Sequence, residues 1–337
     1  MTTGESRPAR RSAVGGPPPE DRGGIPTPED RGGIPTSGIG IPASGIGGPA
    51  SGSSGPPPDG WDGVPAPDGD YGVGIGWRPE IAGFVAELPG LRFVEVIAES
   101  IPAAGPPPGL AELRSRGVTV VPHGVRLSLG GADPVEPARV RQFARAAELL
   151  DAPLASEHIA FVRAGGVEAG HLLPLPRTRE AVDAVVANVA RVRAELPVPL
   201  ALEPIAAIFD WPDDELDEAD FLTEILDRSG ALLLLDIANV YANARNRGAD
   251  PLDLLDRLPL DRIGYVHVAG GAASDGIYHD THTDPVPPEV LELVAELCAR
   301  HRPPALLLER DGHYPPAAAL RAELDAIAAA AGCPAVT

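Results

Sequence analysis

From Tyr71 onward the chain repeats one pattern, in which a short apolar strand is followed by an amphipathic helix. The pattern occurs eight times, which favours a closed (β/α)₈ TIM-like barrel over an open doubly wound sheet. Continuous apolar runs, such as residues 232–235, are typical of parallel strands buried on both faces. No GxGxxG follows the first strand, so a dinucleotide-binding fold has no support. The expected helices begin near Pro79 and then span residues 109–116, 137–150, 178–196, 218–229, 251–258, 288–301 and 316–331.

Side chains that can bind metals stand at the ends of seven predicted strands. Active sites of (β/α)₈ barrels are built at the C-terminal ends of the strands, so we expect these side chains to converge at one face of the barrel. In chain order they are Glu99, His123, His158, Glu203, Asp236, His267 and Glu309.

The seventh unit adds a further pair in the segment YHDTHTDP. Asp280 and His282 are two residues apart, and side chains at that spacing share a face in an extended segment. Both can therefore reach the same site. The expected metal ligands are His123, His158, Glu203, Asp236, His267, Asp280, His282 and Glu309.

The mixture of imidazoles and carboxylates indicates a metal site rather than a purely structural cluster. Carboxylates that point together into a barrel mouth repel one another and lose hydration, and a cation offsets both costs. Histidine and carboxylate ligands without thiolate suit iron, manganese or zinc. Eight candidates exceed the four ligands of a closed structural zinc site, so two or three ions are expected. Ligand count alone does not decide between iron redox chemistry and hydrolysis by zinc or manganese.

The composition limits the class of partner. The 337 residues contain 27 Lys and Arg against 48 Asp and Glu, a net charge of 27 − 48 = −21. This balance argues against nucleic acid or a membrane as the main partner, because binding phosphates or anionic lipid needs a basic patch. Cys298 and Cys333 alone do not make a disulfide framework, and no apolar run is long enough to span a bilayer. Without a recognisable export signal, a cytoplasmic location is expected.

Residues 1–69 differ in composition from the rest. They are rich in Gly, Pro and Ser, and the sequence PEDRGGIPT occurs at residues 19–27 and again at 28–36. Such a segment has few groups to bury and a high conformational entropy. The expected organisation is a disordered low-complexity tail over residues 1–69 and a catalytic barrel over residues 70–335.

The motifs, taken in order, carry a family resemblance. HGVRLSLGGADP, SEHIAF, LLPLPRT, LALEP, LLLDIANVYANARNRGADP, HVAGG, YHDTHTDPVP and LLLERDGHYPP occur in this sequence. Together they resemble the multinuclear non-haem iron-dependent oxidative enzymes, a family that includes the oxidase of methanobactin biosynthesis. The resemblance covers residues 71–316.

The resemblance implies a TIM-like barrel with two or three irons that uses O₂ to modify a ribosomally made precursor peptide, commonly at cysteine. Such enzymes often work with a small partner protein that recognises the leader of the peptide. The family's metal-binding histidines and acids fall on the eight ligands already selected from the strand ends and from the segment YHDTHTDP.

Residues beside the ligands are expected to orient them. The family's S-D-H aspartate is Glu157 here, and the asparagine after its strand-five glutamate is Pro204, so substrate and detailed reaction do not carry over. The catalytic residues expected to orient the ligands in this way are Glu157, Asn239, Arg310 and Asp311.

Two other classes of function remain open from the sequence. One is a zinc- or manganese-dependent hydrolase or isomerase of the xylose-isomerase-like type, which the ligand layout permits. The other is a non-catalytic peptide-binding scaffold that keeps its metal for structure, against which the excess of ligands counts.

Deletion of residues 1–69 is expected to leave the melting temperature nearly unchanged, because the segment offers few apolar side chains to a core. Differential scanning calorimetry of the full chain and the truncated chain measures this. A large fall in melting temperature would show that the segment belongs to the fold.

Overall fold

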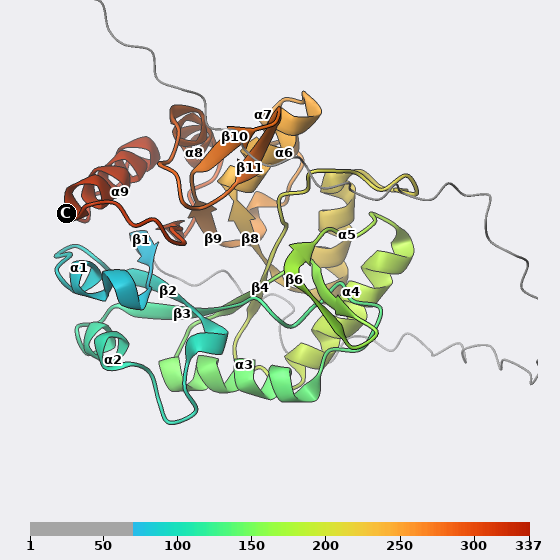
Figure 1. Ribbon diagram of the computed structural model, residues 1–337, viewed down its shortest axis with the longest axis horizontal. Helices are drawn as coiled ribbons and strands as arrows, with labels where there is room; N and C mark the ends of the chain where they lie inside the picture. Colours follow the sequence, from blue (N-terminus) through green and yellow to red (C-terminus); the bar gives the residue numbers. More distant parts are fainter. Residues whose placement is uncertain (1–69) are drawn as a thin grey trace, which may run out of the picture. The chain divides into compact units, whose positions relative to one another are not determined.

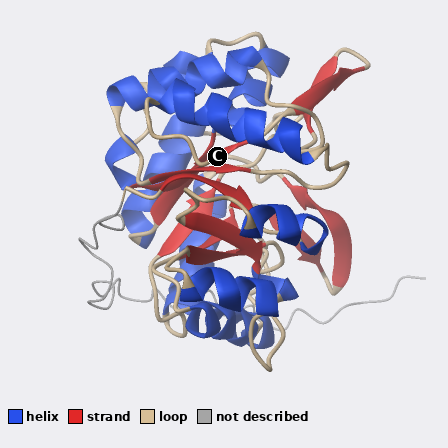
Figure 2. Ribbon diagram, turned by 90° about the vertical axis from the view of Figure 1, so that its left-hand side faces the viewer, coloured by secondary structure: helices blue, strands red, loops and turns tan. Residues whose placement is uncertain are grey.

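The computed structural model describes residues 70–337, and the tail predicted for residues 1–69 lies outside this range. Within it, eight parallel strands close into a barrel in the order β1-β12-β9-β8-β7-β4-β3-β2. The strands lie at the centre and the helices surround them (Figure 1, Figure 2). The predicted (β/α)₈ architecture is therefore confirmed. The barrel strands are β1 Gly72–Gly76, β2 Phe93–Ile97, β3 Thr119–Gly124, β4 Ala155–His158, β7 Leu200–Glu203, β8 Leu232–Asp236, β9 Ile263–Val268 and β12 Ala305–Leu308.

The helices agree closely with the sequence pattern. The helices expected at residues 137–150 and 218–229 have these bounds in the structure, and most of the others differ by a few residues at their ends. The α-helices are α1 Ala82–Ala86, α2 Pro108–Ser115, α3 Pro137–Leu150, α4 Arg179–Arg193, α5 Glu218–Ser229, α6 Ile237–Arg247, α7 Pro251–Leu255, α8 Pro288–Arg300 and α9 Ala317–Ala331, with 3-10 turns η1 Pro79–Ile81, η2 Ala98–Ser100 and η3 Leu260–Arg262.

Helix α6 and two hairpins were not expected. The sequence pattern placed no helix between the apolar run 232–235 and residue 251. In the structure β8 ends at Asp236, whose carboxylate accepts hydrogen bonds from the backbone N–H groups of Ala238 and Asn239 and so begins α6. Similarly, β4 ends at His158 and the chain continues into a hairpin. The hairpins, β5 Phe161–Ala164 with β6 Val167–Leu173 and β10 Gly271–Ser274 with β11 Ile277–Asp280, are inserted in βα loops.

The apolar strand residues divide between two cores. Leu232 and Leu234 belong to a small cluster with Tyr265 and Leu307, whereas Leu233 and Leu235 pack in the larger cluster that includes the helices. The alternation follows from the period of two in a strand, which points successive side chains into the barrel and out of it. Side chains therefore fill the barrel interior in layers, and the polar strand ends lie above this filling.

A close approach between two loops requires glycine at position 270. A Cβ at Gly270 would collide with the backbone oxygens of Asp284 and Pro285, and the Gly270 carbonyl accepts a hydrogen bond from the N–H of His282 at 3.0 Å. The contact holds the segment that carries His282 against the end of β9. A side chain here would displace that histidine.

Gly270→Ala is expected to destabilise the protein by about 1–3 kcal/mol, because backbone atoms cannot move aside as a side chain can. Gly83→Ala is the matched control: nothing lies within 4 Å of its added Cβ and it is in a helix, so its effect should be within about 1 kcal/mol. Urea unfolding of both variants measures the difference. Equal stability of the two variants would contradict this packing.

Candidate metal centre

The register of the barrel places predicted ligands side by side. His158 of β4 is paired with Glu203 of β7, and Asp236 of β8 is paired with His267 of β9. Paired residues of parallel strands point to the same side of the sheet, so each pair enters the barrel mouth together. Glu309 directly follows β12 and joins them at the same level.

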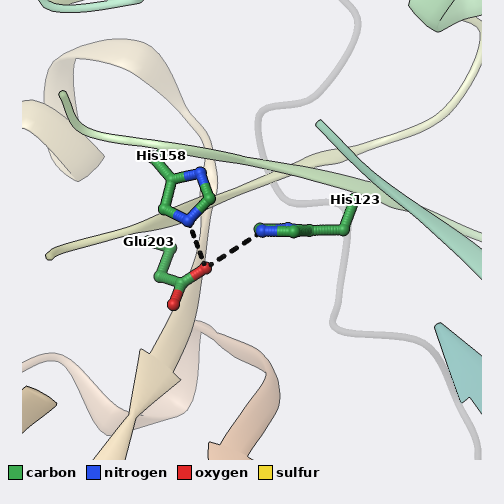
Figure 3. Close-up of side chains that lie close together, drawn as sticks. All are labelled: His123, His158 and Glu203. Carbon is green, nitrogen blue, oxygen red and sulfur yellow. Dashed lines mark ion pairs between the residues drawn. The ribbon is translucent and has the colours of Figure 1, made fainter. Parts of the chain in front are cut away.

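One group of ligands is formed by His123 of β3, His158 of β4 and Glu203 of β7 (Figure 3). The Nε2 atoms of both imidazoles point at a single carboxylate oxygen, Oε2 of Glu203, at 3.5 Å from His123 and 3.4 Å from His158. All three side chains are buried.

A second group lies on the other side of Glu203. The Oε1 atom of Glu203 is 3.4 Å from Nδ1 of His267, and that nitrogen is 2.9 Å from Oε2 of Glu309. Asp236 completes this group. Glu203 thus presents one carboxylate oxygen to each group, which is the arrangement of a bridging ligand.

His282 connects two further groups. Its Nε2 atom is 2.5 Å from Oδ2 of Asp280, and its Nδ1 atom is 3.5 Å from Oε1 of Glu309 and 3.7 Å from Oδ2 of Asp311. Its backbone adopts the left-handed conformation, with φ of 54°, which is uncommon for a non-glycine residue. Hydrogen bonds to the Gly270 carbonyl and from the Asp311 N–H hold it in place.

All eight predicted ligands thus lie in one continuous cluster, and each group shares members with its neighbours. Glu203 links the first group to the second, and Asp236 and Glu309 link the second group to the third and the fourth. The four groups are His123, His158 and Glu203; Glu203, Asp236, His267 and Glu309; Asp236, Asp280 and His282; and His282, Glu309 and Asp311.

The atoms available in these groups fit metal ions. Two ligands that each lie about 2.1 Å from one ion are about 3.0–3.4 Å apart. The separations around Glu203, 3.4 Å and 3.5 Å, are close to this range. Buried polar atoms also lack hydrogen-bond partners here, and an unpaired buried carboxylate oxygen is costly. Within residues 70–337 the cluster atoms that lack a hydrogen-bond partner are Oε2 of Glu203, Oδ2 of Asp236, Nδ1 of His267, Oδ1 of Asp280 and Oε2 of Glu309.

The electrostatics of the cluster favour a cation. Burial, together with the charges of Asp280 and Glu203, raises the pKa of Asp236 to about 8. Burial lowers the pKa of His158, but the neighbouring charges of Glu203 and Glu157 outweigh this and raise the pKa to about 9. Without an ion, the cluster therefore holds protons near neutral pH, and a bound cation would replace them.

Two of the predicted orienting residues contact the ligands or their elements. Glu157 is buried; its Oε1 accepts a hydrogen bond from the N–H of His158 at 2.8 Å and its Oε2 accepts one from Leu127 at 2.9 Å. Asn239 lies in α6 beside Asp236 and donates to the Pro204 carbonyl at 3.2 Å. Their roles in catalysis remain predictions.

The other two predicted orienting residues, Arg310 and Asp311, lie in different surroundings. Arg310 donates to the Asp284 carbonyl and lies 3.5 Å from Glu323, contacts that join it to the loop before α8 and to α9. Asp311 faces the cluster beside His282, and the guanidinium of Arg78 holds its Oδ1 at 2.6 Å. Asp311 is thus placed as a ligand candidate as well as an orienting residue.

The second strand contributes a different residue from the one expected. Glu99 lies in η2, past the end of β2, where its Oε1 accepts from the Val125 N–H at 3.1 Å; it lines a separate cavity of about 240 Å³ with Arg126. It belongs to none of the ligand groups. Instead Glu95, in the middle of β2, is fully buried and lies 2.6 Å from Nε2 of His267. An acid within the apolar strand FVEVI was the signal for it.

The cluster opens onto a cavity of about 300 Å³. Its walls combine ligand candidates with apolar side chains from β2 and from the hairpin β5–β6, so a bound molecule would contact both. The lining residues are Ile97, His123, Val125, His158, Leu172, Glu203, Ile205, Ala206, Asn239, Asp280, His282, Glu309 and Asp311.

A family of peptide-modifying enzymes matches this barrel. The family model described as RiPP precursor modification enzyme MbnB/TglH/ChrH, where RiPP denotes a ribosomally made and later modified peptide, matches residues 72–332. The chain belongs to this family. The match covers every barrel strand, and the resemblance inferred from the motifs is confirmed.

Relatives of the RiPP precursor modification enzyme family carry the name UPF0276 protein. One from Streptomyces avermitilis is 52% identical over 77% of this chain and 55% of its own length, so this chain spans about half of that relative. One from Caulobacter vibrioides is 38% identical over 75% of this chain and 92% of its own length.

Solved structures with a similar fold include a xylose isomerase domain protein from Planctomyces limnophilus, with a TM-score of 0.48 and 16% identity over 77% of this chain and 96% of that one. Endonuclease IV from Thermus thermophilus gives a TM-score of 0.49 and 18% identity over 77% and 98%. Similarity at this level says nothing about activity.

Among residues 70–337 of this family member, no helix is both long and apolar enough to cross a bilayer.

The metal-free protein is expected to lose stability as the pH rises from about 6.5 to 9. The stability from protonated His158 is present below its unfolded pKa and is lost as the pH rises through about 9, and that from protonated Asp236 is lost as the pH rises through about 8. Glu95 adds no slope there, because its pKa is lowered to about 2, where the charges of His267 and His123 outweigh the effect of burial.

Thermal unfolding of chelator-treated protein at pH 6.5, 7.5 and 9 measures this trend. Metal-loaded protein is the control, and its melting temperature should vary much less, since the ions replace the protons. A metal-free protein with a constant melting temperature over this range would contradict the electrostatic account.

Proposed function

We propose that the chain is an iron-dependent oxidative enzyme that holds two or three ions and uses O₂ to modify a ribosomally made precursor peptide, with cysteine as the expected target. The observation that carries the proposal is the sharing of ligands: Glu203, Asp236 and Glu309 each belong to more than one ligand group. A mononuclear or structural site needs about four ligands and no such sharing. The family match supports a precursor peptide as the substrate.

The donor set is compatible with iron. Imidazole and carboxylate ligands without thiolate are common to iron, manganese and zinc sites. Bound iron would supply the O₂-dependent redox chemistry that protein side chains lack. The chain's own residues would hold the ions, exclude water and present the substrate.

The exposure of the cluster suggests where the substrate approaches. Among the residues that line the cavity, His123 and Glu203 are buried, whereas Asp280 and His282 are half-buried. The cavity is at the low end of the roughly 300–1,000 Å³ that small-molecule pockets occupy. We infer that one side chain of the peptide enters it, with the rest of the peptide outside.

Glu157, Asn239 and Asp311 would keep the ligands in place while the substrate is bound, through the contacts that each makes beside His158, Asp236 and His282. A small protein that recognises the leader and a cytoplasmic setting complete the proposal; nucleic acid and membrane are not expected as partners, given the charge of −21.

Protein purified without air is expected to contain more than one iron per chain and to consume O₂ when given its cognate peptide. Elemental analysis and an oxygen electrode measure the two properties. One zinc per chain and no iron would contradict the oxidase and would favour a hydrolase or isomerase.

Asp236→Asn is expected to lower the metal content by at least one ion per chain, because it removes the charge and keeps the helix cap. Asp250→Asn is the matched control, since Asp250 caps α7 through the Leu252 N–H in the same way and belongs to no ligand group. Equal metal content in the two variants would contradict the assignment of Asp236.

A further inference from the structure

Beneath the ligands, a chain of hydrogen bonds begins at one buried acid. Glu95 is fully buried, and its Oε2 atom is 2.6 Å from Nε2 of His267 and 2.7 Å from the hydroxyl of Tyr265. The Tyr265 hydroxyl is 2.5 Å from Oγ of Ser156, and Oγ of Ser156 is 2.8 Å from Nδ1 of His123. One carboxylate is thus linked to two ligand candidates from different groups.

The barrel register explains why the chain can form. Ser156 precedes His158 by two residues, and Tyr265 precedes His267 by two. The period of two in a strand places each pair on the inner face of the barrel, with the polar residue one layer deeper than the ligand. Glu95 enters the same layer from β2.

The number of hydrogens available fixes the direction of each bond. An ionised carboxylate only accepts, so Tyr265 and Nε2 of His267 both donate to Glu95. The single hydroxyl hydrogen of Tyr265 is then used, so Ser156 must donate to Tyr265. The hydrogen of Ser156 is used in turn, so Nδ1 of His123 donates to Ser156.

Each histidine is left with a defined nitrogen free to bind a metal. In His123 the unprotonated nitrogen is Nε2, the atom that faces Glu203. In His267 it is Nδ1 once an ion is bound, the atom that faces Glu203 and Glu309. In both rings, therefore, the nitrogen that the hydrogen bonds of the deeper layer leave unprotonated is the nitrogen that faces the predicted metal ligands. This holds although the two rings are oriented differently.

We propose that Glu95 is a positioning residue that sets the tautomer of His267 directly and the tautomer of His123 through Tyr265 and Ser156, so that opposite ring nitrogens of the two residues face the ions. The proposal rests on the proposed metal function. It distinguishes His123 from His158, whose Nδ1 faces Glu157 instead.

Removing one hydroxyl should break the link without changing the fold. In Tyr265→Phe the Ser156 hydroxyl loses its acceptor and can turn its hydrogen toward Nδ1 of His123. The ring then favours a proton on Nε2, which cannot bind a metal. Ser156→Ala removes the acceptor for Nδ1 directly and is a second route to the same effect.

The tautomer can be measured in the metal-free protein by nitrogen NMR of histidine-labelled samples, with His123→Ala to assign the signal. Burial lowers the pKa of His123, so the ring is neutral at pH 7.5 and its tautomer is defined. The wild type should show a protonated Nδ1, and Tyr265→Phe and Ser156→Ala should shift the ring toward a protonated Nε2. A protonated Nε2 in the wild type, or no shift in either variant, overturns the proposal.

Ser229→Ala is the matched control. Ser229 is a buried serine at the end of α5 whose hydroxyl pairs with backbone groups, at Leu226 and Ala231. It should leave the His123 signal unchanged. A shift in this variant equal to that in Ser156→Ala would mean that the effect is a general loss of packing, and the proposal would fail.

Zinc and cobalt(II) titrations supply a second readout that does not depend on oxidase activity. Tyr265→Phe should lower the affinity for the ion at His123, His158 and Glu203 by about 10–100-fold, as is usual for residues that orient a ligand. It should also alter the absorption spectrum of cobalt bound there. In a His123→Ala background it should have no further effect, because it acts through that ring. An equal loss in both backgrounds would refute the pathway. Absence of iron with normal tautomers and zinc binding would count against the proposed oxidase alone.

Discussion

The site depends on the cost of burying several carboxylates at the mouth of one barrel. Burial is the largest cause of the raised pKa of Asp236, and the neighbouring charges of Asp280 and Glu203 add to it, so that this pKa is raised to about 8. Around Glu309 burial also raises the pKa, but the charges of His282 and His267 outweigh it and the pKa is lowered. Without an ion, protons on imidazoles and acids neutralise the cluster. Divalent ions would replace those protons and satisfy oxygen atoms that lack partners within residues 70–337.

The barrel meets this constraint through its register. Pairing of His158 with Glu203 and of Asp236 with His267 brings ligands from separate strands to the same level. Asp236 then serves two purposes, since Oδ1 begins α6 and Oδ2 is left toward the cluster. The start of helix α6 and the proposed binding of metal therefore depend on the same side chain.

Much of the fold could be predicted because it follows from local periodicity. Strand and helix periods identify the eight units. The C-terminal strand ends predict six of the eight ligand candidates, together with Glu99, which joins no ligand group, and the YHDTHTDP segment adds Asp280 and His282. Helix α6 was missed because an apolar strand runs directly into Ile237 and Ala238, and only the capping role of Asp236 separates the two elements. Ser156 and Tyr265 were missed because the prediction considered strand ends and not the layer below them. The contact between Glu95 and His267 spans 172 residues and depends on barrel closure, which no local pattern contains.

We propose that the overlapping ligand groups hold more than one iron ion. Anomalous X-ray diffraction from crystals grown without air, recorded on both sides of the iron absorption edge, tests it most directly. We expect at least two iron peaks, with Glu203 between two of them and His267 bound through Nδ1. A single peak, or peaks away from Glu203, Asp236 and Glu309, would contradict it.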